Sequence, residues 1–423
     1  MSEHKIRIAI AGGGIAGLAL AAGLTKKPHL EVHVYESVAQ YADIGAGLAI
    51  HLNGIKAMSL IAPDLVKAYQ DKGMTMGEED QEIATQLILA QGPHVGKMVA
   101  ELGRAKGRKT VSRADLLDGF RALVPAECIS FGKRLVEIAE NPRRGIEITF
   151  ADGTSASADC LLGADGIHSV TRSHLLGPNH PATSPKNHDG WQIYRTMVSM
   201  DEARKQIKPQ YTTTVSILLG PKGHINCIPL NQGTRLSAGV AVRGAKFTPD
   251  GKAPELDPEL YNDYSEDAQQ IVRMVARDTS ASWTAADHDH APFYSRRCVA
   301  IFGDAAHAAL PFAGNGAAQA LEDAAVLNAL FEHVFHRSSV EYALAAFSIV
   351  RRPRSQAVVE VAREFGRLYA FALDGVHEDP VRMRGFLQSM GAFMNDFDVA
   401  GQTEEALEIF WDLVREVEWL ATP

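Results

Sequence analysis

The chain has 423 residues, of which 46% are hydrophobic and 22% charged, so it is long enough for two or three domains with large buried cores. The formal net charge of −9 argues against a nucleic acid or an acidic membrane as partner, because such partners need clustered lysine and arginine. The four cysteines lie far apart without a C-x-x-C pair, which indicates neither a disulfide framework nor a zinc site.

The N-terminal segment has the pattern of an α/β domain. Residues 5–11 end in a continuous apolar run, which predicts a buried strand. A glycine-rich turn and a helix rich in alanine and leucine follow, and residues 31–35 predict a second strand that ends at Glu36. The sequence therefore predicts a βαβ unit at the start of the domain.

The turn after the first strand contains a G-x-G-x-x-G motif. Gly12 permits the tight turn, Gly14 lets a pyrophosphate approach the backbone, and Gly17 lets the helix and the strand pack closely. Glu36 is placed to accept hydrogen bonds from the ribose hydroxyls of an adenosine. A plain tight turn between strand and helix is the structural alternative, but the flanking elements favour a dinucleotide site.

The middle of the chain is rich in predicted strands. Residues 145–163 predict a hairpin with strands at 146–150 and 158–162. Four further strands, at residues 191–198, 212–219, 224–229 and 235–242, predict an inserted antiparallel sheet. A strand at 298–302 then returns to the first domain, followed by helices at 316–334 and 341–369, the second interrupted near Pro353, and by a helical tail.

Two more motifs bear on the nucleotide. Residues 163–172 contain D-G-x-x-S-x-x-R, beginning at Asp165, and Gly303-Asp304-Ala305-Ala306-His307 is followed by Gly314-Asn315-Gly316. With the first motif and in this order, the sequence resembles the single-component FAD-dependent aromatic hydroxylases, the family of para-hydroxybenzoate and salicylate hydroxylases. The resemblance spans more than 300 residues and weakens in about the last 60.

The resemblance implies the fold of para-hydroxybenzoate hydroxylase, an α/β (α+β) protein with a discontinuous, Rossmann-like FAD-binding domain. We expect this domain to comprise residues 1–180 and 291–345, the substrate-binding sheet residues 181–290, and a C-terminal helical region residues 346–423. It also implies FAD as cofactor, NAD(P)H as co-substrate, and molecular oxygen. The expected protein is cytoplasmic, without a membrane span, and a monomer or homodimer.

The resemblance also implies roles for individual residues. Asp304 would bind a ribityl hydroxyl of FAD, and Gly316 and Ala317, at a helix start, would face the pyrimidine edge of the flavin, where the helix dipole stabilises negative charge. Asp165 would lie near the pyrophosphate, and Arg113 would contact FAD. The loop containing Ala46 and Gly47 would line the flavin. Asp165 could instead cap a turn, and Arg113 could form only a surface ion pair.

The family chemistry implies a phenolic substrate that is hydroxylated through a flavin C4a-hydroperoxide. We expect a salicylate-like phenol, with decarboxylative or ortho hydroxylation as the family precedent. The substrate reacts best as a phenolate, and His224 matches a histidine that approaches the substrate hydroxyl in salicylate hydroxylases. An unperturbed histidine has a pKa near 6.5, which suits proton removal at neutral pH. Arg195 and Arg243 are candidates for holding a carboxylate or phenolate. His224 could instead be a turn residue that forms hydrogen bonds only to the backbone. Either arginine could be a solvent-exposed residue at the edge of the sheet.

Other hypotheses remain open at this point. The substrate could be a polyketide-derived phenol that undergoes oxidative dearomatisation, although such relatives tend to have tyrosine at the position of His224. The chain could also be a non-catalytic binding protein with the FAD-binding fold. The cluster at residues 287–290 could be mistaken for a metal site, but the family needs no metal. His307 is expected to be structural, and Asn315, a departure from the family pattern, to have little consequence.

Overall fold

The computed structural model describes residues 5–41, 47–75, 83–106, 109–141 and 145–421. One sheet consists of β1 (Ile6–Ala11), β2 (Leu30–Tyr35), β8 (Ile129–Ser130), β12 (Cys160–Gly163), β18 (Ser295–Arg296) and β19 (Val299–Ile301). Its strand order is β18-β19-β12-β1-β2-β8, and only the pairing of β18 with β19 is antiparallel. The predicted strands at residues 5–11, 31–35 and 298–302 are thus confirmed.

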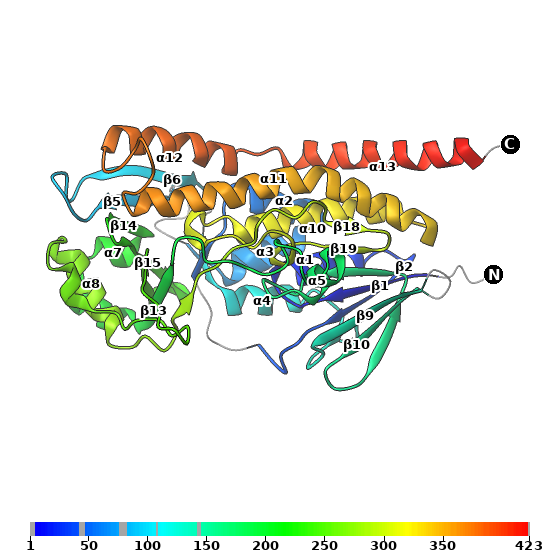
Figure 1. Cartoon of the computed structure of the whole chain (residues 1–423), viewed down its shortest axis with the longest axis horizontal. Coiled ribbons are helices and arrows are strands. Elements are labelled where there is room, and N and C mark those ends of the chain that lie inside the picture. Colours follow the sequence, from blue (N-terminus) through cyan, green and yellow to red (C-terminus); the bar gives the residue numbers. More distant parts are fainter. Residues whose placement is uncertain (1–4, 42–46, 76–82, 107–108, 142–144, 422–423) are drawn as a thin grey trace.

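Helices cover this sheet. Helix α1 (Ile15–Leu24) is buried along almost its whole length, since its small alanine and leucine side chains fit between the sheet and α10 (Gly316–Glu332). The C-terminal helices α11 (Val340–Tyr369), α12 (Pro380–Asn395) and α13 (Val399–Ala421) run along the top of the view in Figure 1. Shorter helices are α2 (Leu52–Ile61), α3 (Pro63–Lys72), α4 (Arg113–Arg121) and α5 (Val170–Leu176).

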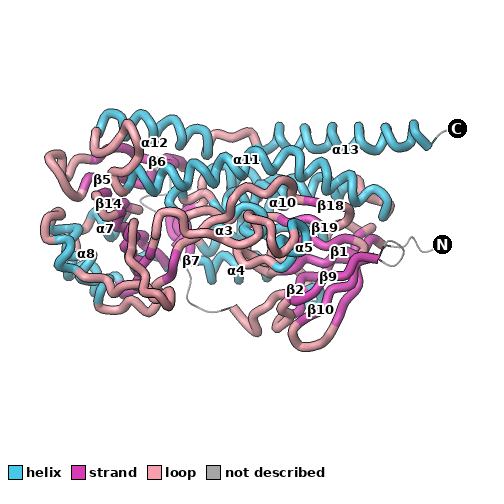
Figure 2. The backbone as a smooth tube through the Cα atoms, viewed as in Figure 1, coloured by secondary structure: helices cyan, strands magenta, loops and turns pink. Residues whose placement is uncertain are grey.

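A second sheet forms the other end of the molecule (Figure 2). It contains β17 (Trp283–Thr284), β13 (Gln192–Ser199), β16 (Arg235–Val242), β15 (Gly223–Leu230), β14 (Ser216–Gly220), β5 (Ile83–Leu89) and β6 (Met98–Ala105), in this spatial order. The predicted insertion is therefore present. The predicted range 181–290 is too narrow for the whole sheet, however, because β5 and β6 come from the range assigned to the FAD-binding domain.

The two faces of this second sheet have different partners. Helices α6 (Met200–Gln206), α7 (Gln210–Thr213) and α8 (Glu266–Ala276) lie beside it, and Ile271 and Val272 of α8 share a buried core with Ile225, Cys227 and Val240. Because side chains alternate along a strand, the residues next to Ile225 and Cys227 point away from that core. That opposite face is the one that lines the cavity described below.

The predicted hairpin is correct only in part. Strand β10 (Gly145–Phe150) pairs with β11 (Ser155–Ala158) and with β9 (Leu135–Asn141), but the chain then leaves this sheet and enters β12. The change occurs at Asp159, whose carboxylate accepts hydrogen bonds from the backbone and the guanidinium of Arg7 on β1. This ion pair links the end of the hairpin to the parallel sheet.

Two other predictions need correction. The predicted strand at 212–219 begins in α7, where Pro209 precedes the first turn and accepts hydrogen bonds from the hydroxyls of Thr212 and Thr213. Helix α11 also continues through Pro353. Proline removes one helical hydrogen bond, but Pro353 is exposed, and Arg351 and Arg354 on either side are held in buried ion pairs.

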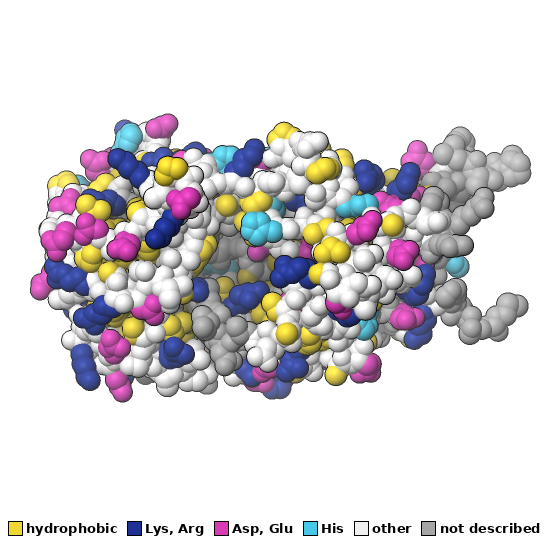
Figure 3. Space-filling view, turned by 60° about the horizontal axis from the view of Figure 1, so that its bottom comes forward, with side chains coloured by type: hydrophobic (Ala, Val, Ile, Leu, Met, Phe, Trp, Pro, Cys, Tyr) yellow, Lys and Arg dark blue, Asp and Glu magenta, His cyan; other side chains and the backbone are white. Residues whose placement is uncertain are grey.

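The surface carries charges of both signs. On the face shown in Figure 3, acidic and basic side chains are interspersed. Within the described ranges, no helix is both long and apolar enough to span a membrane.

A separate three-stranded sheet consists of β3 (Gly47–Ala49), β7 (Lys109–Ser112) and β4 (Met74–Thr75). It lies beside β15 and completes the surroundings of the cavity.

Candidate active site

A cavity of about 470 Å³ lies where the two main sheets and α10 meet. Its lining combines residues from all three sequence motifs with residues from the cavity-facing side of the second sheet. Of the predicted site residues, the lining includes Gly14, Gly47, Arg113, Arg195, His224, Asp304, Gly316 and Ala317. Segments that are distant in the sequence therefore form one site.

The first motif forms the close turn that its glycines predicted. Gly12 has a φ of +107°, and a Cβ atom there would lie 2.2 Å from the carbonyl oxygen of Ala164. A Cβ at Gly17 would lie 2.0 Å from the oxygen of Gly12, so this glycine permits α1 to pack on β1. Gly14 differs, because a Cβ there would meet no heavy atom within 4 Å. Gly12 and Gly17 thus shape the turn, whereas Gly14 borders open space in the cavity.

Glu36 is buried at the end of β2 and partly engaged within the protein. Its carboxylate accepts hydrogen bonds from the backbone N–H of Gly13 at 2.7 Å and of Val38 at 2.9 Å, and from the Ser37 hydroxyl at 3.1 Å. A carboxylate has about four acceptor positions, so capacity remains for ribose hydroxyls. Tyr41 donates to the oxygen of Gly13 from the other side. Ribose binding by Glu36 stays a prediction.

The third motif lies against the first. Gly303 has a φ of +59°, and a Cβ there would lie 2.9 Å from the Cβ of Ala16 in α1. Asp304 follows at the start of the short helix α9 (Asp304–His307), where its side chain is exposed and lines the cavity. The N-terminus of α10, at Gly316 and Ala317, lines the same cavity, and a Cβ at Gly316 would meet nothing within 4 Å.

These features fit an FAD molecule. The N-termini of α1 and α10 both border the cavity, and the positive ends of two helix dipoles suit a pyrophosphate and the electron-rich edge of a flavin. The open spaces at Gly14 and Gly316 allow a ligand to approach the backbone closely at both points. Gly14, Asp304, Gly316 and Ala317 are the residues that would hold it.

Asp165 is not among the residues that line the cavity. Its carboxylate instead accepts hydrogen bonds from the Ser169 hydroxyl at 2.5 Å and from the Thr171 backbone and hydroxyl, which fixes the turn before α5. Burial raises the pKa of this carboxyl group. The turn-capping alternative therefore describes Asp165, and the neighbouring Ala164 and Gly166 are the residues that reach the cavity.

Arg172, the last residue of the second motif, has a role that the sequence analysis missed. Its guanidinium is completely buried and donates to the carbonyl oxygens of Ala305 and Ala306, at 3.0 and 2.6 Å. It also donates to the oxygens of Ala182 and Asp289. Arg172 therefore joins the second motif to the turn that carries Asp304, and its fixed spacing within the motif was the available signal.

Two further predicted FAD contacts come from the start of α4 and the start of β3. Arg113 begins α4, is exposed and lines the cavity. Gly47 begins β3, and a Cβ there would lie 3.0 Å from Ile228 on β15, so the glycine lets these two strands approach. Ala46 lies outside the described residues. Contact of Arg113 and Gly47 with the flavin stays a prediction.

His224 lies on β15 in an aromatic environment. Its ring is 5.0 Å from Phe312 and 5.1 Å from Tyr369, both edge-on, and its Nδ1 has no hydrogen-bond partner among the described residues. Burial lowers the pKa of His224 to about 3, so the pKa near 6.5 expected from the sequence is wrong for this environment. At neutral pH the imidazole is uncharged and offers one acceptor nitrogen.

The two candidate arginines have different positions. Arg195 lines the cavity, with its guanidinium carbon 5.0 Å from the centre of the Trp283 ring, and burial lowers its pKa. No acidic side chain among the described residues pairs with it. Arg243 is not among the lining residues and instead forms an ion pair with Asp189 at 3.2 Å. The structure thus supports Arg195 and not Arg243 as an anion-binding residue of the cavity.

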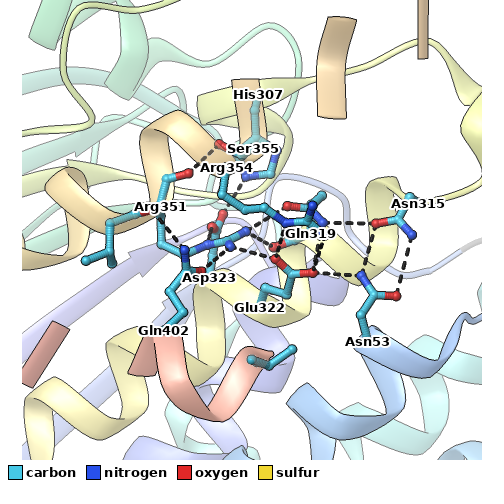
Figure 4. A network of polar contacts seen from close by, with 12 residues as sticks. Asn53, His307, Asn315, Gln319, Glu322, Asp323, Arg351, Arg354, Ser355 and Gln402 are labelled. Atoms are coloured by element: carbon cyan, nitrogen blue, oxygen red, sulfur yellow. Dashed lines mark hydrogen bonds and ion pairs between the residues drawn. The ribbon is translucent and has the colours of Figure 1, made fainter. Parts of the chain in front are cut away.

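A buried polar network lies behind the N-terminus of α10 (Figure 4). Asn315 donates to Asn53 and accepts from Asn53 and Gln319, and Asn53 also donates to Glu322. Glu322 in turn binds Arg351 at 2.6 Å. Asn315, expected to have little consequence, is therefore connected through this network to α11.

The charged cluster at residues 287–290 forms ion pairs within the protein. Asp287 binds Arg363 at 2.8 Å, Asp289 binds Lys186 at 2.6 Å, and His290 lies 3.0 Å from Glu360. Among the described residues, no group of histidine, cysteine and acidic side chains has an arrangement that could hold a metal ion. These residues connect the strand-rich insertion to α11.

Comparison with known proteins places this site in a family. Residues 137–362 match the family described as FAD binding domain. The chain is also 36% identical to the 6-methylsalicylate 1-monooxygenase of Aspergillus terreus, over 98% of this chain and 94% of that protein. The chain belongs to the FAD-dependent monooxygenases of the salicylate hydroxylase and 6-methylsalicylate monooxygenase family.

Two further comparisons agree with this assignment to the FAD-dependent monooxygenases. The salicylate hydroxylase of Pseudomonas putida is 29% identical over 87% of this chain and 88% of that protein. A solved structure of a salicylate hydroxylase substrate complex has a TM-score of 0.81 and 26% identity, covering 96% of this chain and 98% of that one. The predicted fold, the FAD cofactor and the monooxygenase activity on an aromatic substrate are confirmed, and the non-catalytic hypothesis is set aside.

Proposed function

We propose that this monooxygenase hydroxylates a phenol that carries a carboxylate group, in the manner of salicylate or 6-methylsalicylate. The observation that carries the proposal is the partly buried Arg195, which has no acidic partner among the described residues and lies on the same sheet face as His224. A cation without a protein anion in an apolar cavity is favourable for an anionic ligand. The names of the relatives from Aspergillus terreus and Pseudomonas putida support the same substrate class.

The sheet geometry relates the two side chains. Arg195 pairs with Gly239 across β13 and β16, and His224 pairs with Ala241 across β15 and β16. Their backbone positions are therefore two strands and two residues apart, which is roughly 12 Å at the usual strand spacing and rise per residue. Both side chains are long enough to reach a small ring between them. Arg195 would hold the carboxylate, and His224 would accept a hydrogen bond from the phenol.

The protein contributes positioning, charge and exclusion of water. FAD, when bound, takes electrons from NAD(P)H and activates oxygen for transfer to the ring. Neutral His224 accepts the hydrogen bond of the substrate hydroxyl, which increases electron density on the ring without placing another charge in the cavity. Phe312, Tyr369 and Trp283 provide apolar surface around the ring and limit the access of water.

The test is the anaerobic reduction of the flavin by NADH with candidate phenols, followed by product analysis in air. Salicylate or 6-methylsalicylate should bind, accelerate NADH oxidation and yield a hydroxylated product. A resorcyl aldehyde represents the alternative class of polyketide-derived phenols that undergo oxidative dearomatisation. Turnover of the aldehyde with no binding or product from either carboxylated phenol would overturn the proposal in favour of that class.

A further inference from the structure

Asn226 lies in the cavity with its carboxamide unused. It lines the cavity two residues after His224 on β15, and no side-chain hydrogen bond of Asn226 occurs within the described part of the chain. Asn226 is half-buried, so water can satisfy its carboxamide when the cavity holds no ligand. A free carboxamide that faces a ligand cavity is therefore available for a ligand.

The strand register places Asn226 opposite Arg195. Both residues pair with Gly239, Arg195 from β13 on one side and Asn226 from β15 on the other. A Cβ at Gly239 would lie 2.8 Å from the Asn226 Oδ1, so the carboxamide leans over this glycine toward β13. Gly239 thus leaves the space into which the Asn226 side chain extends, and Arg195 borders that space from β13. An alanine in place of Gly239 would displace the Asn226 side chain.

The same geometry separates Asn226 from His224. The two residues lie two positions apart on one strand face, which corresponds to about 6.8 Å along an antiparallel strand. A ring with a hydroxyl and a carboxylate on adjacent carbons has its two oxygen groups close together, so one such ligand reaches both residues. The carboxylate would then lie over Gly239 and the hydroxyl toward His224.

We infer that Asn226 is a specificity-determining residue that binds the substrate carboxylate together with Arg195 across Gly239. The inference rests on the proposed function, because it assigns Asn226 to the carboxylate of that substrate class. The guanidinium supplies the charge and up to two hydrogen bonds, and the Asn226 amide supplies one more to a carboxylate oxygen. A neutral ligand group at this place would gain less from the two residues.

The experiment compares two ligands of equal shape and different charge. Salicylate and its neutral analogue salicylamide are titrated into the FAD-bound wild-type enzyme and into Asn226→Asp and Asn226→Leu, with binding followed by the change in flavin absorbance. Asn226→Asp places a second anion beside the carboxylate, and Asn226→Leu removes the donor while keeping the branching and the number of side-chain heavy atoms. Asn179→Asp, at an exposed asparagine that is not among the cavity-lining residues, controls for the added charge.

Loss of one hydrogen bond to a charged group weakens binding by about 10- to 100-fold. Both Asn226 variants should therefore bind salicylate at least about 10-fold more weakly, with less than about a threefold change for salicylamide. In steady-state assays the KM for salicylate should rise more than kcat falls. Flavin content and thermal midpoint show whether each variant is folded, and the second substitution serves if the first does not fold.

The outcomes separate the two claims. If the wild type prefers salicylate and both variants keep that preference, the inference is wrong while the proposed function stands. If the wild type binds salicylamide as tightly as salicylate and hydroxylates no carboxylated phenol, the proposed function is wrong and the inference fails with it.

Discussion

The Nε of Arg351 lies 2.7 Å from the Oδ1 of Asp323, and both side chains are completely shielded from solvent. The second oxygen of Asp323 accepts hydrogen bonds from the Gly303 N–H and from His307. Burial acts to raise the pKa of Asp323, but the charges of His307 and Arg351 outweigh it and lower that pKa. Asp323 and Arg351 thereby connect the turn that carries Asp304 to α11. His307 has a structural role in this connection, as expected.

Replacing Arg351 by leucine should destabilise the enzyme strongly. The change removes the buried cation that Glu322 and Asp323 share and leaves them with Arg354 and His307 as ion-pair partners, which costs about 3–5 kcal/mol. Urea unfolding measures the loss. Arg415→Leu removes an exposed ion pair with Asp412 and should cost less than about 1 kcal/mol. Equal losses in the two variants would show that the network contributes little.

Gly12→Ala should abolish FAD binding, because the new Cβ would collide with the oxygen of Ala164 and displace the nucleotide turn. Gly132→Ala is the matched control, since Gly132 also has a positive φ but has no heavy atom within 4 Å of the added Cβ. The control should retain its flavin and lose about 1–2 kcal/mol of stability from backbone strain alone. Flavin absorbance per chain after purification distinguishes the two. A yellow Gly12→Ala protein would contradict the prediction.

Arg195 and Arg243 should behave differently toward a carboxylated phenol. Arg195→Met should raise the KM for salicylate by about 10- to 100-fold, because a charged partner in the cavity is lost. Arg243→Met breaks only the ion pair with Asp189 outside the cavity lining and should change the KM by less than about threefold. The reverse order of effects would assign the anion to Arg243.

The stability of the enzyme should depend on His224 at acidic pH. The pKa of His224 is about 3 in the folded state and near 6.5 in an unfolded chain, so the unfolded state binds a proton first as the pH falls. The contribution of neutral His224 to the free energy of unfolding is therefore fully present above pH 6.5 and is lost as the pH falls from 6.5 to 3. His224→Gln should reduce the loss between pH 7.5 and 5 by about 2 kcal/mol. His288, with a similarly lowered pKa, is present in both proteins and cancels. Identical pH slopes in urea unfolding would refute this.

Hydroxylation should respond to His224 in the opposite pH range. His224→Ala removes the acceptor of the phenol hydrogen bond, so the rate should fall more at neutral pH than at a pH above the pKa of the substrate hydroxyl, where the phenol loses its proton to solvent. Rates of product formation across the pH range, measured beside the wild type, test this. A rate ratio that is constant with pH would remove His224 from the chemistry.

The elements that were predicted well are those that local pattern determines. The strand, glycine turn and helix from Ile6 to Leu24 and the strands β13, β15 and β16 follow from apolar periodicity and turn residues. The position of β5 in the second sheet could not be predicted from local pattern, because its partner strand β14 comes more than 100 residues later. The division of the hairpin at Asp159 likewise depends on Arg7, which is distant in the sequence.

The site shows the same limit. The glycine motifs predicted the turn at Gly12 and the helix start at Gly316 because backbone geometry demands those residues. Asp165 and Arg243 were assigned to ligands because their protein partners, Thr171 and Asp189, could not be known from residue type alone. Asn226 was missed, although its alternation with His224 on one strand was a usable signal.

The alternation of faces in the second sheet has an evolutionary consequence. Positions such as His224, Asn226 and Gly239 point into the cavity, while Ile225, Cys227 and Ala238 pack against the helices behind. Mutations at the first set can change which molecule is accepted, and they leave the packing that maintains the sheet untouched. Related enzymes with this architecture can therefore diversify their chemistry by single amino-acid exchanges, without a prior gain in stability.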